Sequence, residues 1–231
     1  MIPWTQLASA DIPDGGGELR LKQRGQEFSI MLGTTELMNS RLSGSEKALA
    51  TLSCDRIKNH PAPHVLIGGL GMGFTLRATQ AELGPDARIT VAELVPAVVE
   101  WARGPMAAVY GNSLDDPRLS IIETDVGRLI RSARGSYDAM LLDVDNGPEG
   151  LTRKSNDSLY NFSGLRAART ALRPGGVLAV WSSAPDHDFT WRLREVGFAV
   201  EEVRVRANGS GGGARHIIWV AVNPGGSTQP R

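Results

Sequence analysis

The chain has 231 residues, with 25 basic and 25 acidic side chains, four histidines and one cysteine. This length is enough for one sizeable domain with a full core, and the balanced charge argues against a dedicated nucleic-acid surface. A single cysteine excludes an internal disulfide, and the histidines lack metal-ligand spacing. No segment has the pattern of a signal peptide or of a membrane span, so we expect a cytoplasmic protein that needs no metal.

Residues 1–60 are expected to form a small β appendage and a linking helix. Met1–Gly17 is rich in proline and glycine and is interpreted as a loosely held lead-in. Three short strands are expected next, the first two as a hairpin: Glu18–Arg24, Glu27–Leu32 and Thr34–Met38. The run from Ser43 to Glu46 is then expected to cap a helix that continues to about Ile57.

Residues 61–231 show strands and helices in alternation, which is typical of a parallel sheet with crossover helices. The expected strands are Val65–Ile67, Ile89–Ala92, Leu119–Ile122, Ala139–Leu142, Val177–Trp181, Ala199–Val205 and His216–Val222. The expected helices are Thr75–Leu83, Val95–Ala108, Val126–Ala133, Ser163–Leu172 and Asp188–Val196. Only a glycine-rich turn separates the last two strands, which predicts an antiparallel final strand. Five βα units followed by a β-hairpin indicate the Rossmann-like α/β fold of class I S-adenosylmethionine-dependent transferases, with a seven-stranded sheet.

A glycine-rich turn follows the first strand of this larger part. Gly69, Gly71 and Gly73 stand at alternate positions, where the missing Cβ permits a tight turn and lets a ligand lie against the backbone. The dinucleotide fingerprint has a different spacing, so a nucleoside without a pyrophosphate fits better. Glu93 ends the next strand, where an acid can accept both ribose hydroxyls. The alternative is a plain strand-to-helix connection that binds nothing.

Three aspartates follow later strands of the same sheet. Asp125 precedes a helix, so it is either an N-cap, a contact to the adenine amino group, or both. Asp143 ends the fourth strand and Asp145 lies two residues further on. In open α/β sheets the carboxyl ends of the strands line the ligand crevice. These two carboxylates are interpreted either as the binding and deprotonating groups for a cationic amine or as a solvated acidic turn.

Three segments of the sequence resemble the spermidine synthase (polyamine aminopropyltransferase) family. Ile67–Arg77 is similar to that family's glycine loop, and Ala92–Glu100 is similar to its ribose-binding strand and following helix. Asp143, with Gly147-Pro148 and Leu159-Tyr160 beyond it, resembles the catalytic loop. The resemblance implies that Glu93 holds the ribose, that Asp125 contacts the adenine, and that Asp143 orients and deprotonates the attacking amine. It also implies that Gln23 and Glu46 face the site.

Three departures from the family pattern bear on the substrate. Met72, included here in the predicted ligand-binding turn, stands where the family has an acid that grips the aminopropyl amine. The second acid of the catalytic loop is either shifted to Asp145 or replaced by Asn146. Ser45-Glu46 stands where a Tyr-His-Glu-like run is expected, and the chain is shorter than a typical member.

The resemblance implies an enzyme of polyamine biosynthesis that moves an aminopropyl group from decarboxylated S-adenosylmethionine to a small amine, and that forms a homodimer. Methyl transfer from S-adenosylmethionine to a small amine, thiol or acid is the alternative, since both reactions displace a group from a sulfonium. A non-catalytic nucleoside-binding scaffold and, more distantly, a nicotinamide oxidoreductase stay open. Neither a nucleic acid nor a membrane is an expected partner.

Overall fold

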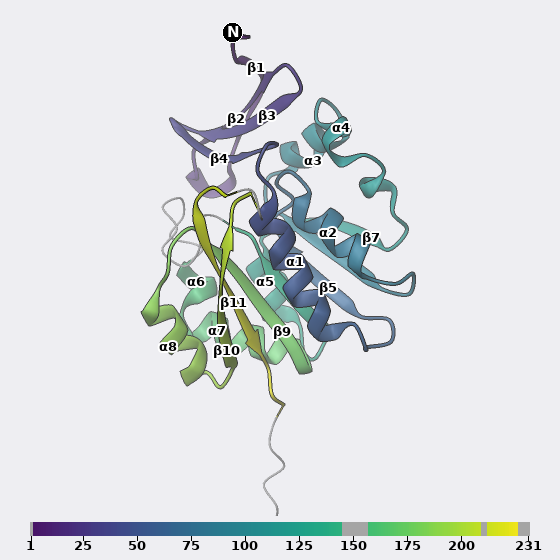
Figure 1. Cartoon of the computed structure of the whole chain (residues 1–231), viewed down its shortest axis with the longest axis vertical. Helices are drawn as coiled ribbons and strands as arrows, with labels where there is room; N and C mark the ends of the chain where they lie inside the picture. Colours follow the sequence, from purple (N-terminus) through teal and green to yellow (C-terminus); the bar gives the residue numbers. More distant parts are fainter. Residues whose placement is uncertain (1, 145–156, 209–211, 226–231) are drawn as a thin grey trace, which may run out of the picture.

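The computed structural model describes residues 2–144, 157–208 and 212–225, which form two β-sheets and a set of flanking helices. The larger sheet has seven strands in the order β10-β11-β9-β8-β5-β6-β7 (Figure 1). Their bounds are β5 His64–Gly68, β6 Arg88–Glu93, β7 Leu119–Glu123, β8 Tyr137–Leu142, β9 Leu172–Ser182, β10 Ala199–Arg206 and β11 Arg215–Val222. Strands β5 to β9 pair in parallel, and β11 is antiparallel to both of its neighbours. The expected sheet, with its antiparallel final strand, is confirmed.

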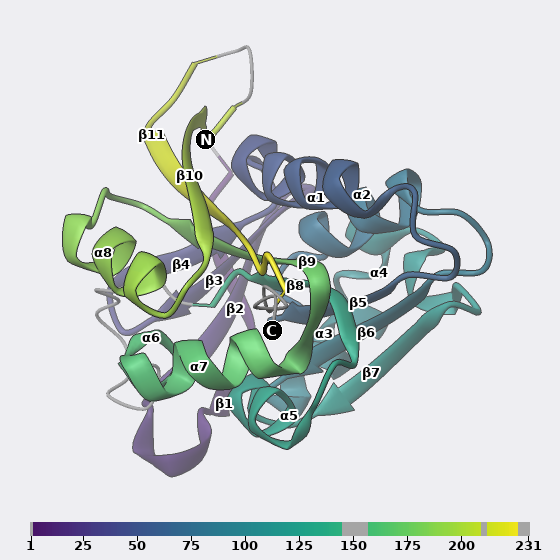
Figure 2. The same ribbon diagram turned by 90° about the horizontal axis from the view of Figure 1, so that it is seen from below.

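Helices cover both faces of this sheet (Figure 2). Their bounds are α1 Gly44–Ile57, α2 Phe74–Glu82, α3 Pro96–Arg103, α4 Ala107–Tyr110, α5 Val126–Ser132, α6 Asp157–Tyr160, α7 Phe162–Ala171 and α8 His187–Glu195. One buried cluster lies beneath α1, α2 and α3, and a second lies beneath α5, α7 and α8. Apolar residues therefore occupy both faces of the central strands, as a buried parallel sheet requires. None of the helices in the described ranges is long and apolar enough to cross a membrane.

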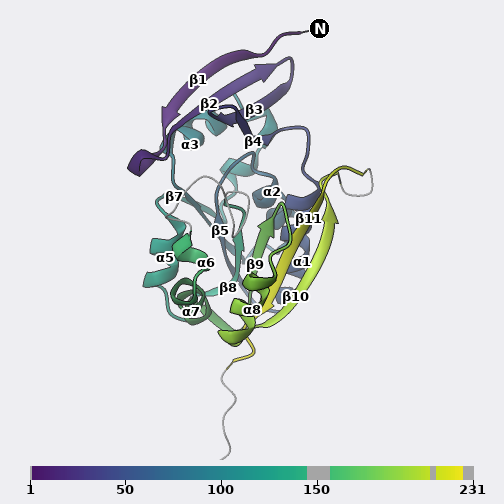
Figure 3. The ribbon, with the colours of Figure 1, turned by 90° about the vertical axis from the view of Figure 1, so that its left-hand side faces the viewer.

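The smaller sheet lies across the carboxyl ends of strands β5 and β6 (Figures 1 and 3). It is antiparallel and its strands are consecutive: β1 Thr5–Asp11, β2 Glu18–Arg24, β3 Glu27–Leu32 and β4 Thr35–Asn39. Leu21 and Ile30 are fully buried and belong to the same cluster as Leu49 of α1 and Leu76 of α2. Both sheets thus share a continuous core, while the division of the chain at residue 60 stays a prediction.

The structure corrects three expectations from the sequence. The expectation of a loosely held lead-in over Met1–Gly17 is wrong in part, because Thr5–Asp11 forms β1, an exposed edge strand stabilised by pairing with β2. The expected helix Val95–Ala108 is split into α3 and α4, since Gly104 and Pro105 interrupt the backbone hydrogen bonds. Ser43 does occupy the N-cap position of α1, but its side chain makes no capping hydrogen bond.

Asp138 ties strand β8 to the segments on either side of it. Its buried carboxylate accepts hydrogen bonds from the His64 backbone N–H at 2.7 Å, from His60 Nδ1 at 2.9 Å and from Arg173 Nη1 at 2.6 Å. Burial by itself would raise the pKa of this carboxyl group, but the three donors outweigh burial and lower the pKa. The ionised form is therefore the one that stabilises the fold.

We expect Asp138→Ala to lower the free energy of unfolding at pH 7 by about 1.5 to 3 kcal/mol, because it removes the hydrogen bonds that the buried carboxylate accepts from His64 and from the partly exposed Arg173 and His60. Since the folded pKa lies below the unfolded value, this stabilisation is present at neutral pH and disappears as the pH falls below about 4. Urea unfolding measures both effects. Asp55→Ala removes an exposed pair with Lys58 and is the matched control, with an expected cost under about 1 kcal/mol. Equal costs for the two variants would contradict the role of Asp138.

Candidate active site

The site lies where the direction of strand order reverses, at the carboxyl ends of β5 and β8. These strands are parallel neighbours, with Gly68 opposite Leu142. The chain crosses from β5 to β6 and β7 on one side, and returns to β8 on the other, which opens a crevice at that point. The Asp143 backbone N–H donates to the Gly68 carbonyl at 3.3 Å, so the first residue after β8 lies against the start of the glycine turn.

The glycine turn is held in a conformation that side chains would obstruct. Gly69, Gly71 and Gly73 have φ angles of +89°, +52° and +73°, in the left-handed region that favours glycine. A Cβ on Gly73 would strike the ring of Tyr110, whose hydroxyl donates to the Gly71 carbonyl. A Cβ on Gly71 would lie 3.1 Å from the sulfur of Met38 in β4. The turn is therefore closely covered from α4 on one side and from the N-terminal sheet on the other.

Glu93 fastens this turn to the end of β6. Its carboxylate accepts a hydrogen bond from the Leu70 backbone N–H at 2.9 Å and another from the Val95 backbone N–H at 2.8 Å. The residue is only 7% exposed, and this burial raises the pKa of its carboxyl group against the opposing effect of the backbone donors. Glu93 is thus a structural element of the turn, whatever ligand it also binds.

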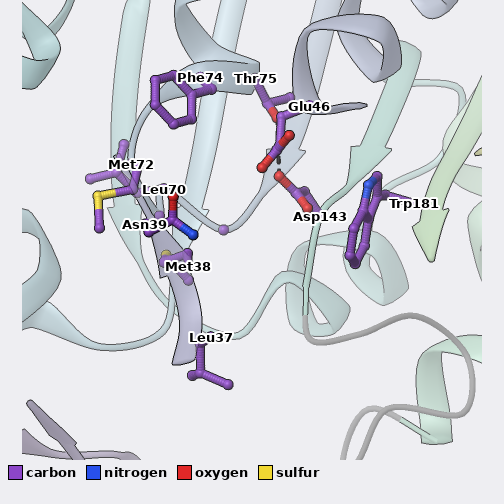
Figure 4. A pocket seen from close by; sticks show the side chains of 12 residues that line it. Leu37, Met38, Asn39, Glu46, Leu70, Met72, Phe74, Thr75, Asp143 and Trp181 are labelled. Carbon is purple, nitrogen blue, oxygen red and sulfur yellow. Dashed lines mark hydrogen bonds between the residues drawn. The ribbon is translucent and has the colours of Figure 1, made fainter. Parts of the chain in front are cut away.

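Two adjoining pockets open at this edge of the sheet. The first, here named the Glu93 pocket, has Glu93, Leu94, Asp125 and Val126 in its wall and is closed by side chains of the N-terminal sheet. The second, the Glu46 pocket, is drawn in Figure 4, and its wall includes Glu46, Thr75 and Trp181. Both pockets are lined by Leu37, Met38, Gly69, Gly71 and Asp143. A molecule that fills both must therefore pass between the glycine turn and Asp143.

The Glu46 pocket combines two carboxyl groups with an apolar wall. Figure 4 shows the carboxyl groups of Glu46, from α1, and Asp143, from the end of β8, pointing toward one another. Thr75 Oγ1 donates to Asp143 Oδ2 at 3.1 Å. Burial and, after it, the negative charge of Glu46 raise the pKa of Asp143 to about 7, against the smaller effect of Thr75. Burial also raises the pKa of Glu46. Such a pair has an affinity for a cation or a proton.

The predicted site residues divide into those that reach the two pockets and those that do not. Met72 is buried and lines the Glu46 pocket, so an apolar side chain faces this part of the crevice. Asp125 lines the Glu93 pocket and is also the N-cap of α5, where it accepts from the Arg128 backbone N–H at 3.1 Å. Gln23 does not line either pocket; its amide donates to Gly25 in the β2–β3 turn. Asp145 lies outside the described residues.

Several pocket residues were not expected from the sequence. Leu37, Met38 and Asn39 of β4 cover the glycine turn, and Trp181 at the end of β9 forms the wall beyond Asp143. Thr75 holds Asp143 from the first turn of α2. A signal did exist for two of them: Thr75 begins the helix expected after the glycine turn, and Trp181 ends the strand expected at the carboxyl edge. The β4 residues carried no such signal.

Known proteins resemble this chain in sequence and in fold, although no protein-family model matches it. Over 133 residues it is 35% identical to polyamine aminopropyltransferase 1 of Streptomyces coelicolor, covering 54% of this chain and 24% of that protein. Over 153 residues it is 31% identical to the polyamine aminopropyltransferase of Mycobacterium tuberculosis, covering 62% of this chain and 28% of that protein. Spermidine synthase of Thermotoga maritima superimposes with a TM-score of 0.72 at 18% identity, covering 94% of this chain and 72% of that one.

The chain is similar in sequence to polyamine aminopropyltransferases and shares its fold with a spermidine synthase. The resemblance noted in the sequence is confirmed, and so is the fold, which has the larger α/β sheet and a separate small antiparallel sheet. The chain spans about a quarter of the length of those two curated relatives. The activity of this chain and its substrates are therefore argued from the site.

We expect Glu46→Gln to lower the pKa of Asp143 toward the ordinary aspartate range, because the substitution removes the nearest negative charge and leaves the volume unchanged. Asp143 then loses its proton at lower pH than in the unsubstituted protein. Titration of the side-chain carboxyl carbons by NMR measures the change. Glu82→Gln on α2 is the control and leaves the Asp143 titration in place. An unchanged titration in Glu46→Gln would show that the two groups do not interact.

Proposed function

We propose that this protein transfers an aminopropyl group from decarboxylated S-adenosylmethionine to a small amine. The observation that carries the proposal is the joining of the two pockets: the Glu93 pocket meets the Glu46 pocket between the glycine turn and Asp143. In this arrangement the nucleoside occupies the Glu93 pocket, with its ribose on Glu93 and its adenine near Asp125. The sulfonium then lies over Gly69 and Gly71, and the reactive carbon points toward the Glu46 pocket.

The paired carboxyl groups support an amine as the acceptor. An aliphatic amine has a pKa near 10 and is protonated at neutral pH, so it enters as a cation and must lose a proton before it attacks carbon. Glu46 and Asp143 supply the negative charge for binding. A carboxyl group with a pKa of about 7, as burial and Glu46 give Asp143, is matched to accept that proton near neutral pH. Thr75 keeps Asp143 oriented.

The reaction is an in-line displacement at carbon. The lone pair of the amine nitrogen forms a new bond to the aminopropyl carbon on sulfur, and the carbon–sulfur bond breaks with its electron pair retained by sulfur. The sulfonium thereby becomes the neutral thioether of methylthioadenosine. The proton lost by the acceptor passes to Asp143. No covalent intermediate with the protein is required, so positioning of the two substrates and exclusion of water account for the rate.

Met72 favours one second candidate, methyl transfer from S-adenosylmethionine. The buried thioether offers no charge to the ammonium group of an aminopropyl chain. In the methyl-donor arrangement the carboxylate of S-adenosylmethionine lies near the N-terminal end of α2, where free backbone N–H groups favour an anion. A scaffold that binds a nucleoside without turnover is the remaining candidate. Our proposal further includes a homodimer and a cytoplasmic location.

We expect decarboxylated S-adenosylmethionine and methylthioadenosine to raise the melting temperature more than S-adenosylmethionine and S-adenosylhomocysteine do, since at equal concentration the ligand that binds the folded state more tightly stabilises it more. A thermal-shift panel measures this. A larger shift with the second pair would instead support methyl transfer.

The same panel tests the ribose assignment. Glu93→Ala should abolish all of the shifts, with circular dichroism to verify that the variant is folded and Glu82→Ala as the control. Shifts that persist in folded Glu93→Ala would contradict the assignment.

We expect Asp143→Asn to lower turnover by roughly 10²- to 10⁴-fold, the usual effect of removing a general base, and to leave binding of methylthioadenosine largely intact. Formation of methylthioadenosine from decarboxylated S-adenosylmethionine and a diamine gives the rate, and calorimetry gives the affinity. Asp55→Asn on the exposed side of α1 is the control. Turnover equal to that of Asp55→Asn would exclude Asp143 as the base, and a lack of turnover in the unsubstituted protein with every acceptor tried would favour the scaffold.

A further inference from the structure

We propose that Ser45 and His216 position the Glu46 carboxylate, and that they return to solvent the proton that Asp143 takes from the acceptor amine and passes to Glu46 across the pocket. His216 lies on β11, in the C-terminal hairpin, and Ser45 lies in the first turn of α1. This inference rests on the proposed function, in which Glu46 binds the acceptor amine beside Asp143. It adds a series of three hydrogen-bonded side chains, Glu46, Ser45 and His216, that leads from the Glu46 pocket to the partly exposed ring on β11.

The contacts that carry the proposal form an unbroken series. Ser45 Oγ donates to Glu46 Oε2 at 2.8 Å, and His216 Nδ1 lies 3.0 Å from the same Ser45 oxygen. Ser45 is 1% exposed, so its hydroxyl has no access to bulk water. Glu46 is in the pocket wall and His216 is partly exposed. The series therefore connects the pocket with the protein surface through a buried hydroxyl.

Two further contacts fix the positions of His216 and of the first turn of α1. The ring of His216 packs edge-on against Trp181, with the ring centres 4.7 Å apart, and Trp181 itself lines the Glu46 pocket. The backbone N–H of Gly44, which begins α1, donates to the carbonyl of Ala207 at the end of the β10–β11 hairpin, at 2.8 Å. The first turn of α1 is thus fastened to the hairpin by its backbone as well as through Ser45. His216 thus contacts Trp181 in the pocket wall directly and reaches Glu46 through Ser45.

The direction of the hydrogen bonds assigns the resting tautomer. An ionised carboxylate only accepts, so the Ser45 hydroxyl proton points to Glu46. The Ser45 oxygen is then free to accept, which places the proton of the neutral imidazole on Nδ1 of His216. In this state Ser45 stabilises the charged form of Glu46, and the hydrogen bond opposes the effect of burial on the pKa of Glu46. Burial lowers the pKa of His216, so a neutral ring is its resting form.

Proton return reverses these hydrogen bonds and then restores them. When Glu46 has taken the proton from Asp143, its O–H donates to Ser45. The neutral His216 ring exchanges its proton with water, losing one from Nδ1 and gaining one on Nε2, and Nδ1 then accepts from the Ser45 hydroxyl. Transfer along the series leaves Glu46 ionised, Ser45 neutral and His216 as the imidazolium. The imidazolium releases its Nε2 proton to water and is again neutral with the proton on Nδ1. One proton leaves the pocket and no group is consumed.

The charged groups near Glu46, Ser45 and His216 do not offer a second route for the proton. Asp143 faces Glu46 across the pocket, and Lys47 follows it on α1. On β10 the residue paired with His216 is Val205, whereas Arg204 and Arg206 alternate to the opposite face of the strand. Further along α1 and β10, Arg56 and Glu201 form an ion pair with one another. Among the described residues, Ser45 alone bridges Glu46 to a titratable ring.

Ser45→Ala tests the positioning step, with Ser53→Ala as the matched control. Both serines are buried in α1, but Ser53 Oγ donates to the Leu49 carbonyl of its own helix. We expect Ser45→Ala to raise the pKa of Glu46 by about one pH unit, as loss of a hydrogen bond to a charged group requires, and to raise the KM of the acceptor. Carboxyl-carbon NMR follows Glu46 directly. Ser53→Ala should change neither, and an identical Glu46 titration in both variants would overturn the proposal.

His216→Asn tests the proton-return step. An asparagine amide can donate to Ser45 as Nδ1–H does, but it cannot carry a proton through the ring. We expect this variant to keep the Glu46 titration, to keep KM within about twofold, and to lower kcat by about tenfold or more, the lower end of the effect of a proton-transferring group. Added imidazole should restore part of the loss. His64→Asn, at the opposite end of β5, is the control with another half-buried histidine.

The outcomes separate this proposal from the proposed function. An unchanged kcat in His216→Asn over the whole pH range would overturn proton return, even if the enzyme is an aminopropyltransferase. If the unsubstituted protein turns over no acceptor, the proposed function fails, and the NMR titration of Glu46 in Ser45→Ala against Ser53→Ala still decides whether Ser45 holds that carboxylate.

Discussion

The Glu93 carboxylate joins the glycine turn to the next strand, and the geometry of the site depends on it. Two backbone N–H groups, those of Leu70 and Val95, donate to its oxygens from segments 25 residues apart in the chain. A buried carboxylate is costly unless donors satisfy it, so these bonds offset part of the cost of burying Glu93 and hold the turn. The positive φ angles of the turn persist because this clamp, the Tyr110 hydroxyl and Met38 restrain it. Asp143 packs against the same turn, so the position of the turn determines the position of Asp143.

Local patterns were sufficient to predict much of the fold and part of the site. The glycine turn, Glu93 and Asp143 lie at the ends of short, apolar, buried strands, and Asp125 follows the more exposed edge strand β7; the rule that ligands gather at carboxyl strand ends relates them. The strands Glu18–Arg24 and Glu27–Leu32 were predicted with the bounds that the structure shows. Glu46 was placed near the site only through the resemblance to the spermidine synthase family, and the structure brings it opposite Asp143.

Features that depend on contacts between distant segments were not accessible from the sequence. Strand β1 is mostly exposed, with only Ala8 and Ala10 half-buried, and it forms because β2 offers a free edge. The covering of the glycine turn by Leu37 and Met38 follows from how the small sheet lies on the large one, which no local pattern encodes. The link from Ser45 to His216 joins residues 171 positions apart. The sequence indicated Ser45 only as part of a helix cap, whereas its hydroxyl serves Glu46 instead.

The two sheets contribute different parts of the site, and this separation has an evolutionary consequence. The groups assigned to the chemistry are anchored to the large sheet and to α1, while part of the roof over both pockets comes from β4 of the small sheet. Substitutions at Leu37 or Asn39 alter the shape and polarity presented to an incoming molecule, whereas Met38 also packs on the glycine turn. Proteins that share the strand ends and α1 of this site can therefore differ in selectivity through a few side chains on one short antiparallel strand.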